Sequence, residues 1–180
     1  MAGWPGERSH LFTPFSYTGS LPRLQLLLRQ VHLAEFDVRP ATRENSSAIR
    51  LLIRTVQINP IGLRWRRFLV AVTSKGNLLG CGQIKPHADG SREMASIAVR
   101  EQARGQGIAR AIIEALLVLE PERPLYLMCR AHLQPLYVKF GFQIIGLDEM
   151  PPYFRRIRGV ERFFNARAKP DNRLLVMRLY

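Results

Sequence analysis

The chain has 180 residues and a formal net charge of +13, from 27 Lys and Arg against 14 Asp and Glu. This length fits one domain, and a composition of 47% hydrophobic and 23% charged residues excludes wholesale disorder. No apolar run approaches the roughly 18 to 20 residues that cross a bilayer, so no membrane span is expected. The two cysteines, Cys81 and Cys129, lack the spacing of a zinc site or a disulfide scaffold. We therefore expect a cytoplasmic protein without a metal.

Positive charge gathers toward the C-terminus, where residues 151–180 carry seven arginines and Lys169 against Glu161 and Asp171. Such an excess favours nucleic acid, an anionic membrane surface or an acidic small ligand such as a nucleotide cofactor. A solvated, arginine-rich face accounts for the charge equally well. Charge alone therefore leaves the partner open.

The hydrophobic pattern divides the chain into an N-terminal extension, residues 1–34, and one domain, residues 35–180. The extension holds a leucine-rich stretch with helical spacing at 24–33, and an organelle-targeting segment is its less favoured interpretation. Strands and helices then alternate, which predicts a mixed α/β domain. In chain order we predict a strand at 36–39, a helix from Thr42 or Asn45 to 59, strands at 68–73, 78–85 and 93–99, a helix at 107–119, a strand at 125–129, a helix at 134–140, a strand at 142–147, a helix at 152–169 and a strand at 174–179.

A glycine-rich turn at 104–109 lies between a predicted strand and the long amphipathic helix that follows it. Such a turn exposes backbone N–H groups at a helix N-terminus, where the helix dipole favours a phosphate. Arg110 stands where a dinucleotide fingerprint needs its third glycine, and no Gly-Lys-Ser/Thr sequence of a Walker loop is present. The turn therefore fits neither of these two phosphate loops.

In its context this turn resembles the acetyl-CoA-binding motif of the GNAT acetyltransferase superfamily, Arg/Gln-x-x-Gly-x-Gly/Ala, with Arg104, Gly107 and Ala109 at the defined positions. The stretch at 136–142 is similar to a second GNAT signature, a tyrosine followed four and five residues later by Gly-Phe; the tyrosine here is Tyr137. The two motifs stand in the family's order. The resemblance covers residues 37–147 and is expected to continue to Tyr180.

The resemblance implies a mostly antiparallel sheet of about seven strands with flanking helices, whose central strand pair is splayed. It also implies acetyl-CoA as the acetyl donor, with its pyrophosphate on the loop amides and its pantetheine arm paired along the splayed strand, where one amide would stabilise the thioester oxyanion. A simple buried strand is the alternative for those strand residues. The implied cofactor-binding residues are Ile97, Ala98, Val99, Arg104, Gly105, Gln106, Gly107, Ile108, Ala109 and Arg110.

Acetyl transfer to an amine poses two proton problems, and the resemblance assigns one residue to each. Tyr137 matches the tyrosine that acts as acid toward the leaving CoA thiolate; a core tyrosine is the alternative. Glu93 starts the strand that leads to the loop, where many relatives have a glutamate acting as base directly or through water. Its alternative is an exposed carboxylate at a strand end.

Three further side chains are weaker candidates. Cys129 would need an activating base, and His132 sits in a different element, so a buried structural cysteine is favoured. His87 and Asp89 share a turn, but two ligands are poor support for a metal. Arg130 and Leu133 occupy positions where many relatives carry Asn or Ala, so we expect the cleft to differ in detail.

The predicted function is an N-acetyltransferase that moves the acetyl group of acetyl-CoA to a primary amine of a small molecule or protein by direct attack. The alternative is a CoA-holding basic module without turnover, contacting nucleic acid or an acidic partner. Nucleic acid is the less favoured partner, and a monomer and a homodimer stay open. The basic face of that alternative consists of Arg155, Arg156, Arg158, Arg162 and Arg167.

By the family's pattern the acceptor is gripped by the segments 59–68 and 148–169. The arginines of these segments on which the charge argument rests are Arg64, Arg66, Arg67, Arg155, Arg156 and Arg158. If both segments face the cleft, anionic or zwitterionic amines should be preferred to polyamines. Trp65, Tyr153 and Phe154 are either walls of the acceptor site or core residues.

Overall fold

The computed structural model describes residues 36–164 and 173–180 and holds a seven-stranded sheet of order β1-β2-β3-β4-β5-β7-β6. The extension 1–34, with its leucine-rich stretch, and the end of the helix predicted at 152–169 lie outside these residues. All neighbouring strands are antiparallel except β4 and β5, which confirms a mixed, mostly antiparallel sheet. The strands are β1 (Asp37–Pro40), β2 (Phe68–Val72), β3 (Leu78–Pro86), β4 (Arg92–Val99), β5 (Leu125–Arg130), β6 (Gln143–Ile144) and β7 (Leu174–Leu179).

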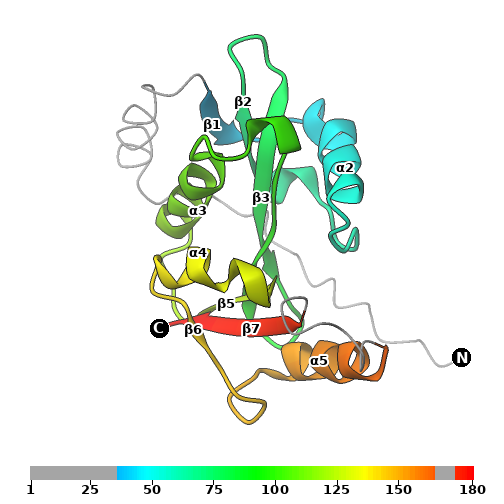
Figure 1. Ribbon diagram of the computed structural model, residues 1–180, viewed down its shortest axis with the longest axis vertical. Coiled ribbons are helices and arrows are strands. Elements are labelled where there is room, and N and C mark those ends of the chain that lie inside the picture. The colour runs from blue at the N-terminus through cyan, green and yellow to red at the C-terminus, as the bar shows by residue number, and fades with distance from the viewer. Residues whose placement is uncertain (1–35, 165–172) are drawn as a thin grey trace, which may run out of the picture.

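Four α-helices flank this sheet in the described part of the chain: α2 (Asn45–Thr55), α3 (Ile108–Leu119), α4 (Gln134–Val138) and α5 (Pro152–Phe164). Short 3-10 turns are η2 (Trp65–Arg67), η3 (Glu101–Ala103) and η4 (Ala131–Leu133). Figure 1 shows α3 to the left of β3 and α2 to its right, with α4 above β7 and α5 below it. None of the helices within residues 36–164 is long and apolar enough to cross a membrane.

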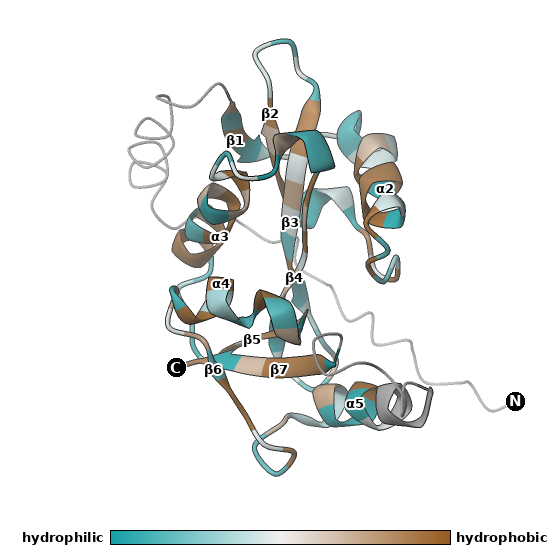
Figure 2. Ribbon diagram, in the orientation of Figure 1, coloured by the Kyte–Doolittle hydropathy of each residue, from teal (hydrophilic) through white to brown (hydrophobic). Residues whose placement is uncertain are grey.

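Side chains on alternating positions of the strands form three apolar clusters with the helices: one with α3 and α4, one with α2 and one with α5. Leu127 and Cys129 of β5 pack with Ile112 of α3 and Tyr137 of α4. Tyr126, between them in sequence, points the other way and packs with Phe154 of α5, while α2 packs on β2 and β3. Figure 2 shows the corresponding apolar colour on β2 and β7. The sheet thus separates an α3/α4 face from an α2/α5 face.

The predicted elements are present, and several are shorter than predicted, among them α2, α4 and β6. Helix α2 stops at Thr55, because Gln57 adopts a φ of 56°, a left-handed conformation that ends a helix. The last short strand before α5 covers only Gln143–Ile144, although Ile145 N–H still donates to the Val176 carbonyl at 3.1 Å.

A β-bulge distorts β4 at its middle. Cys81 pairs with Ala98 and Gln83 with Ala95, which leaves two residues, Ser96 and Ile97, opposite Gly82 alone. Ser96 takes a φ of 57° there, as a bulge requires. A Cβ on Gly82 would lie 2.5 Å from Ile97 Cδ1, so only glycine allows this close approach.

Strands β4 and β5 pair over only two residues, Glu93 with Tyr126 and Met94 with Leu127. From Ala95 onward the β5-facing edge of β4 has no strand partner in the described structure, while its other edge stays bonded to β3. The predicted splayed central strand pair is therefore confirmed. Such an open edge offers backbone N–H and C=O groups to an extended ligand.

Candidate active site

The loop between β4 and α3 is shaped by two glycines with positive φ, Gly105 at 80° and Gly107 at 79°. Gly107 is the N-cap of α3, and nothing lies within 4 Å of a Cβ built on either glycine, so the backbone conformation and not crowding requires them. The N–H groups of Gly105, Gln106 and Gly107 find no hydrogen-bond acceptor among the described residues. With the open N–H groups of the first helical turn they form a set of hydrogen-bond donors that suits an anion.

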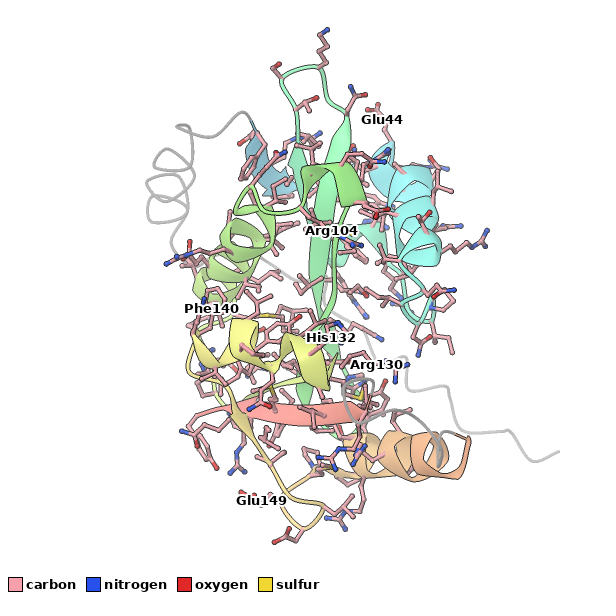
Figure 3. All side chains as sticks on the ribbon, in the orientation of Figure 1. Glu44, Arg104, Arg130, His132, Phe140 and Glu149 are labelled. Carbon is pink, nitrogen blue, oxygen red and sulfur yellow. The ribbon has the colours of Figure 1, made fainter. Side chains whose placement is uncertain are left out.

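The side chains around this loop differ in how far they are available to a ligand. Arg110 Nε donates to Glu114 Oε1 at 2.9 Å, and this hydrogen bond raises the pKa of the exposed guanidinium. Arg104 has no such partner within the described structure, and Figure 3 shows it beside the sheet above Arg130, the last residue of β5, and His132 of η4. Arg104 is thus the better placed of the two predicted phosphate-binding arginines.

The three predicted pantetheine-binding residues, Ile97, Ala98 and Val99, lie on β4 beyond its last pair with β5. Ala98 and Val99 keep their register with Cys81 and Gly80 of β3. The segment therefore is a half-paired strand that leads directly into the anion-binding loop.

Tyr137 lies on α4 and is only 6% exposed. Its ring meets Phe142 edge-on, with the centroids 6.2 Å apart. Burial first, and then the neighbouring Cys129 thiol, raise the pKa of Tyr137 well above its ordinary value. Its hydroxyl finds no hydrogen-bond partner in residues 36–164 and 173–180. The protonated hydroxyl on the α3/α4 face can therefore donate a hydrogen bond to a ligand.

Glu93 is buried, so its interpretation as an exposed strand-end carboxylate is wrong. Its Oε2 lies 2.9 Å from Nε2 of His87 and 3.9 Å from Nζ of Lys85. Both contacts use Oε2, and Oε1 has no hydrogen-bond partner among the described residues. Met94, the next residue, packs in the cluster that contains Tyr137, so Glu93 points to the α2/α5 face.

His87 is the functional candidate that sequence reasoning undervalued, since it was considered only as half of a weak metal pair with Asp89. Its ring stacks on Tyr153 at 3.5 Å between centroids, and Asp89 Oδ2 accepts a 2.7 Å hydrogen bond from the Tyr153 N–H. The signal was available: His87 follows the predicted strand that ends at Lys85, and the next strand begins at Glu93. A hairpin between these two strands brings the His87 side chain toward Glu93.

Neither cysteine is suited to be a nucleophile. Burial raises the pKa of the Cys129 thiol to about 11 and that of Cys81 to about 12. The Cys129 thiol donates to Met177 Sδ at 3.8 Å, and His132 lies on η4. No group of three or more His, Cys, Asp or Glu that could hold a metal occurs within the described residues.

The second acceptor-side segment contributes less than the sequence suggested. Arg155 donates to the Met150 carbonyl at 3.1 Å, Arg156 to that of Pro152 at 3.3 Å, and Arg158 to that of Leu174 at 2.6 Å. Phe154 is fully buried and is a core residue, while Tyr153 and Trp65 are partly buried. The guanidinium groups of Arg155, Arg156 and Arg158 thus donate to backbone carbonyl groups in and around α5.

Comparison with curated protein sequences found no match. Among solved structures, N-acetylglutamate synthase from Neisseria gonorrhoeae, complexed with coenzyme A and N-acetyl-glutamate, has a TM-score of 0.59 at 22% identity, over 82% of this chain and 36% of that chain. The chain therefore spans about a third of that synthase.

Two further structures share the fold over nearly their whole length. Rv2747 from Mycobacterium tuberculosis, in complex with CoA, has a TM-score of 0.59 at 23% identity over 79% of this chain and 97% of that chain. Arabidopsis thaliana Naa50, in complex with a bisubstrate analogue, has a TM-score of 0.53 at 13% identity over 82% of this chain and 99% of that chain. Residues 64–144, which include the anion-binding loop, Glu93 and Tyr137, match the family model of the acetyltransferase (GNAT) domain. The chain is thus similar to GNAT acetyltransferases through this segment, and the solved structures share its fold.

Proposed function

We propose that the protein transfers the acetyl group of acetyl-CoA to a primary amine by direct attack. The observation that carries this is the placement of Glu93 and Tyr137 on opposite faces of the sheet, where β4 leaves β5. A base on one face and a hydrogen-bond donor on the other suit a reaction whose two substrates meet at the opening. The CoA complexes of the N. gonorrhoeae and M. tuberculosis proteins, which share the fold, support the donor.

The residues around the opening fit acetyl-CoA. The unpaired N–H groups of Gly105, Gln106 and Gly107 would bind its pyrophosphate, with Arg104 adding charge-assisted hydrogen bonds. The open edge at Ile97–Val99 would pair with the pantetheine arm, as an added strand does. An N–H group of this edge would also stabilise the negative charge on the thioester oxygen as the amine attacks.

The proton of the attacking amine would pass to Glu93. Its Oε1 is the oxygen without a partner, while His87 and Lys85 hold Oε2. The histidine therefore fixes the carboxylate, and the incoming amine meets the other oxygen, directly or through water. In this role His87 is a positioning residue.

Tyr137 would donate a hydrogen bond to the CoA sulfur as the C–S bond breaks. Its raised pKa keeps the hydroxyl protonated at neutral pH, and the absence of another partner in the described structure leaves its hydrogen for the leaving thiolate. Because both cysteine thiols are also protonated, neither is suited to form an acyl-cysteine, and the acetyl group would pass directly from CoA to the amine. A CoA-holding module without turnover is not favoured, since it would not require the Glu93 carboxylate and the Tyr137 hydroxyl.

Binding and turnover can be tested in sequence on the full chain. Isothermal titration with CoA measures donor binding, and release of the CoA thiol from acetyl-CoA over a panel of amines measures transfer. The proposal expects CoA binding and amine-dependent thiol release that Glu93→Gln lowers. Binding of CoA without thiol release for any amine would leave the non-turnover module as the correct account, and absence of both would overturn donor binding as well.

A further inference from the structure

We propose that a pocket lined by Arg50, Arg54 and Arg64 binds an anionic group of the acceptor, so that the enzyme acetylates amines carrying a carboxylate or a phosphate. This inference rests on the proposed acetyl transfer. The pocket has a volume of about 360 Å³ and lies between helix α2 and the segment before η2, with Pro60, Gly62 and Leu63 completing its wall. A volume of this size suits a small ligand or the end of a chain.

The charge in the pocket is not neutralised by any residue that the structure describes. No acidic side chain among the described residues forms an ion pair with any of the three pocket arginines. Arg50 donates only to the neutral Ser46 Oγ, at 3.2 Å. Nearby Arg67 has a lowered pKa, first because of burial and then because of the positive charge of Arg64. An anion would relieve this repulsion and accept guanidinium hydrogen bonds.

The pocket is joined to the proposed base by one lysine. A Cβ at Gly62, in the pocket wall, would lie 3.2 Å from Lys85 Cε, so the pocket wall touches the Lys85 side chain. Nζ of the same lysine lies 3.9 Å from Glu93 Oε2. The pocket and the base thus adjoin on the α2/α5 face, and one acceptor molecule can place its anionic group at the arginines and its amine at Glu93.

A buried polar atom supports a polar ligand on this face. Gln83 precedes Lys85 by two residues and therefore shares its side of β3. The Gln83 side chain is fully buried, its Nε2 donates to Ser96 Oγ at 3.1 Å, and its Oε1 has no hydrogen-bond partner within the described structure. Such an acceptor suits a substrate N–H group better than an apolar chain.

The test uses two matched pairs of amines that differ only in the anion: β-alanine with β-alaninamide, and O-phosphoethanolamine with ethanolamine. We expect kcat/KM to be higher for the anionic member of at least one pair, and the pair with the larger ratio identifies carboxylate or phosphate. In the double variant Arg54→Gln/Arg64→Gln this ratio should fall about tenfold or more, the usual size of a charge-assisted hydrogen bond. Arg43→Gln, an exposed arginine just before α2, is the control and should leave the ratio unchanged.

Three outcomes overturn the proposal: equal rates within both pairs, a double variant that slows both members equally, or a preference for spermidine. CoA binding by the double variant checks that the donor side is intact. If no amine is acetylated at all, the proposed transfer fails, and the pocket is judged by calorimetric titration of the two anionic amines into the full chain. Binding lost in the double variant then supports the pocket, and no binding, or binding of a short RNA alone, overturns it.

Discussion

His87 Nε2 lies 2.9 Å from Glu93 Oε2, and both side chains are more than nine-tenths buried. The same histidine stacks on Tyr153, and Asp89 from the same turn accepts the Tyr153 backbone N–H. The β3–β4 turn and the first turn of α5 therefore hold the carboxylate together. Loss of any of these contacts should therefore first alter the position of the Glu93 carboxylate.

His87→Ala is expected to lower kcat for acetyl transfer, because Glu93 loses the group that holds Oε2. His87→Gln, which keeps an N–H donor, should restore part of the rate. If His87 acts through Glu93, it has little left to contribute once the carboxylate is gone. Steady-state kinetics of His87→Ala, His87→Gln, Glu93→Gln and the double variant His87→Ala/Glu93→Gln test this. Strictly additive losses would show that His87 acts independently of Glu93.

Tyr137→Phe is expected to lower kcat by about 10² to 10⁴, the usual span for a lost acid–base group. Stability should hardly change, since the hydroxyl has no protein partner in the described structure that would be left unpaired. Thermal melts with and without CoA, together with kcat from thiol release, measure both effects. An unchanged kcat, with chemistry shown to be the slow step, would remove Tyr137 from the mechanism.

Gly107→Glu is expected to abolish thermal protection by CoA, because its carboxylate would occupy the space that the phosphates need. The wild type should gain about 2.7 kcal/mol when CoA is at one hundred times its Kd. Gly90→Glu is a matched control, since Gly90 also has a positive φ, 82°, and open space around its Cβ position. Both variants should share the cost of backbone strain, and only Gly107→Glu should lose the protection. Retained protection in Gly107→Glu would disprove the loop assignment.

The cysteines should resist alkylation in the folded protein. Burial disfavours the thiolate and raises the pKa to about 11 for Cys129 and about 12 for Cys81, so the reactive form is scarce at pH 8 and grows only as the pH approaches these values. Iodoacetamide at pH 8, followed by mass spectrometry, should label them only after unfolding. Rapid native labelling would contradict the low reactivity of the buried thiols, and an acetylated cysteine trapped with acetyl-CoA would contradict direct transfer.

The sequence was sufficient for the parts of the site that depend on local order. Glycines at 105 and 107 before an amphipathic stretch predict a strand, a tight turn and a helix, and the structure has all three. The seven strands followed from alternation and from turn residues between them. These signals are local, so one sequence carries them.

The parts that depend on packing between distant segments were not predictable. An exposed strand end was the alternative interpretation of Glu93, but helix α5, about sixty residues later, places Tyr153 and Phe154 against His87 and covers that end. Conversely, Arg155 and Arg158 lie in a segment that the sequence assigns to the acceptor side, but they donate to the carbonyl groups of Met150, just before α5, and Leu174, at the start of β7. Charge and periodicity do not reveal which carbonyl groups tertiary structure brings within reach.

The brief pairing of β4 with β5 has a mechanical consequence. Only two residue pairs join the strands, so the width of the opening is set chiefly by side chains that touch both halves of the sheet. On the α3/α4 face these include Met94 from β4 and Leu127 from β5, which share a core cluster with Ile112 from α3. Their close packing acts as a spacer, because a dense core transmits a small change in volume as a shift of the elements around it. A methyl group removed there, far from any reacting atom, would change the aperture through which donor and acceptor meet.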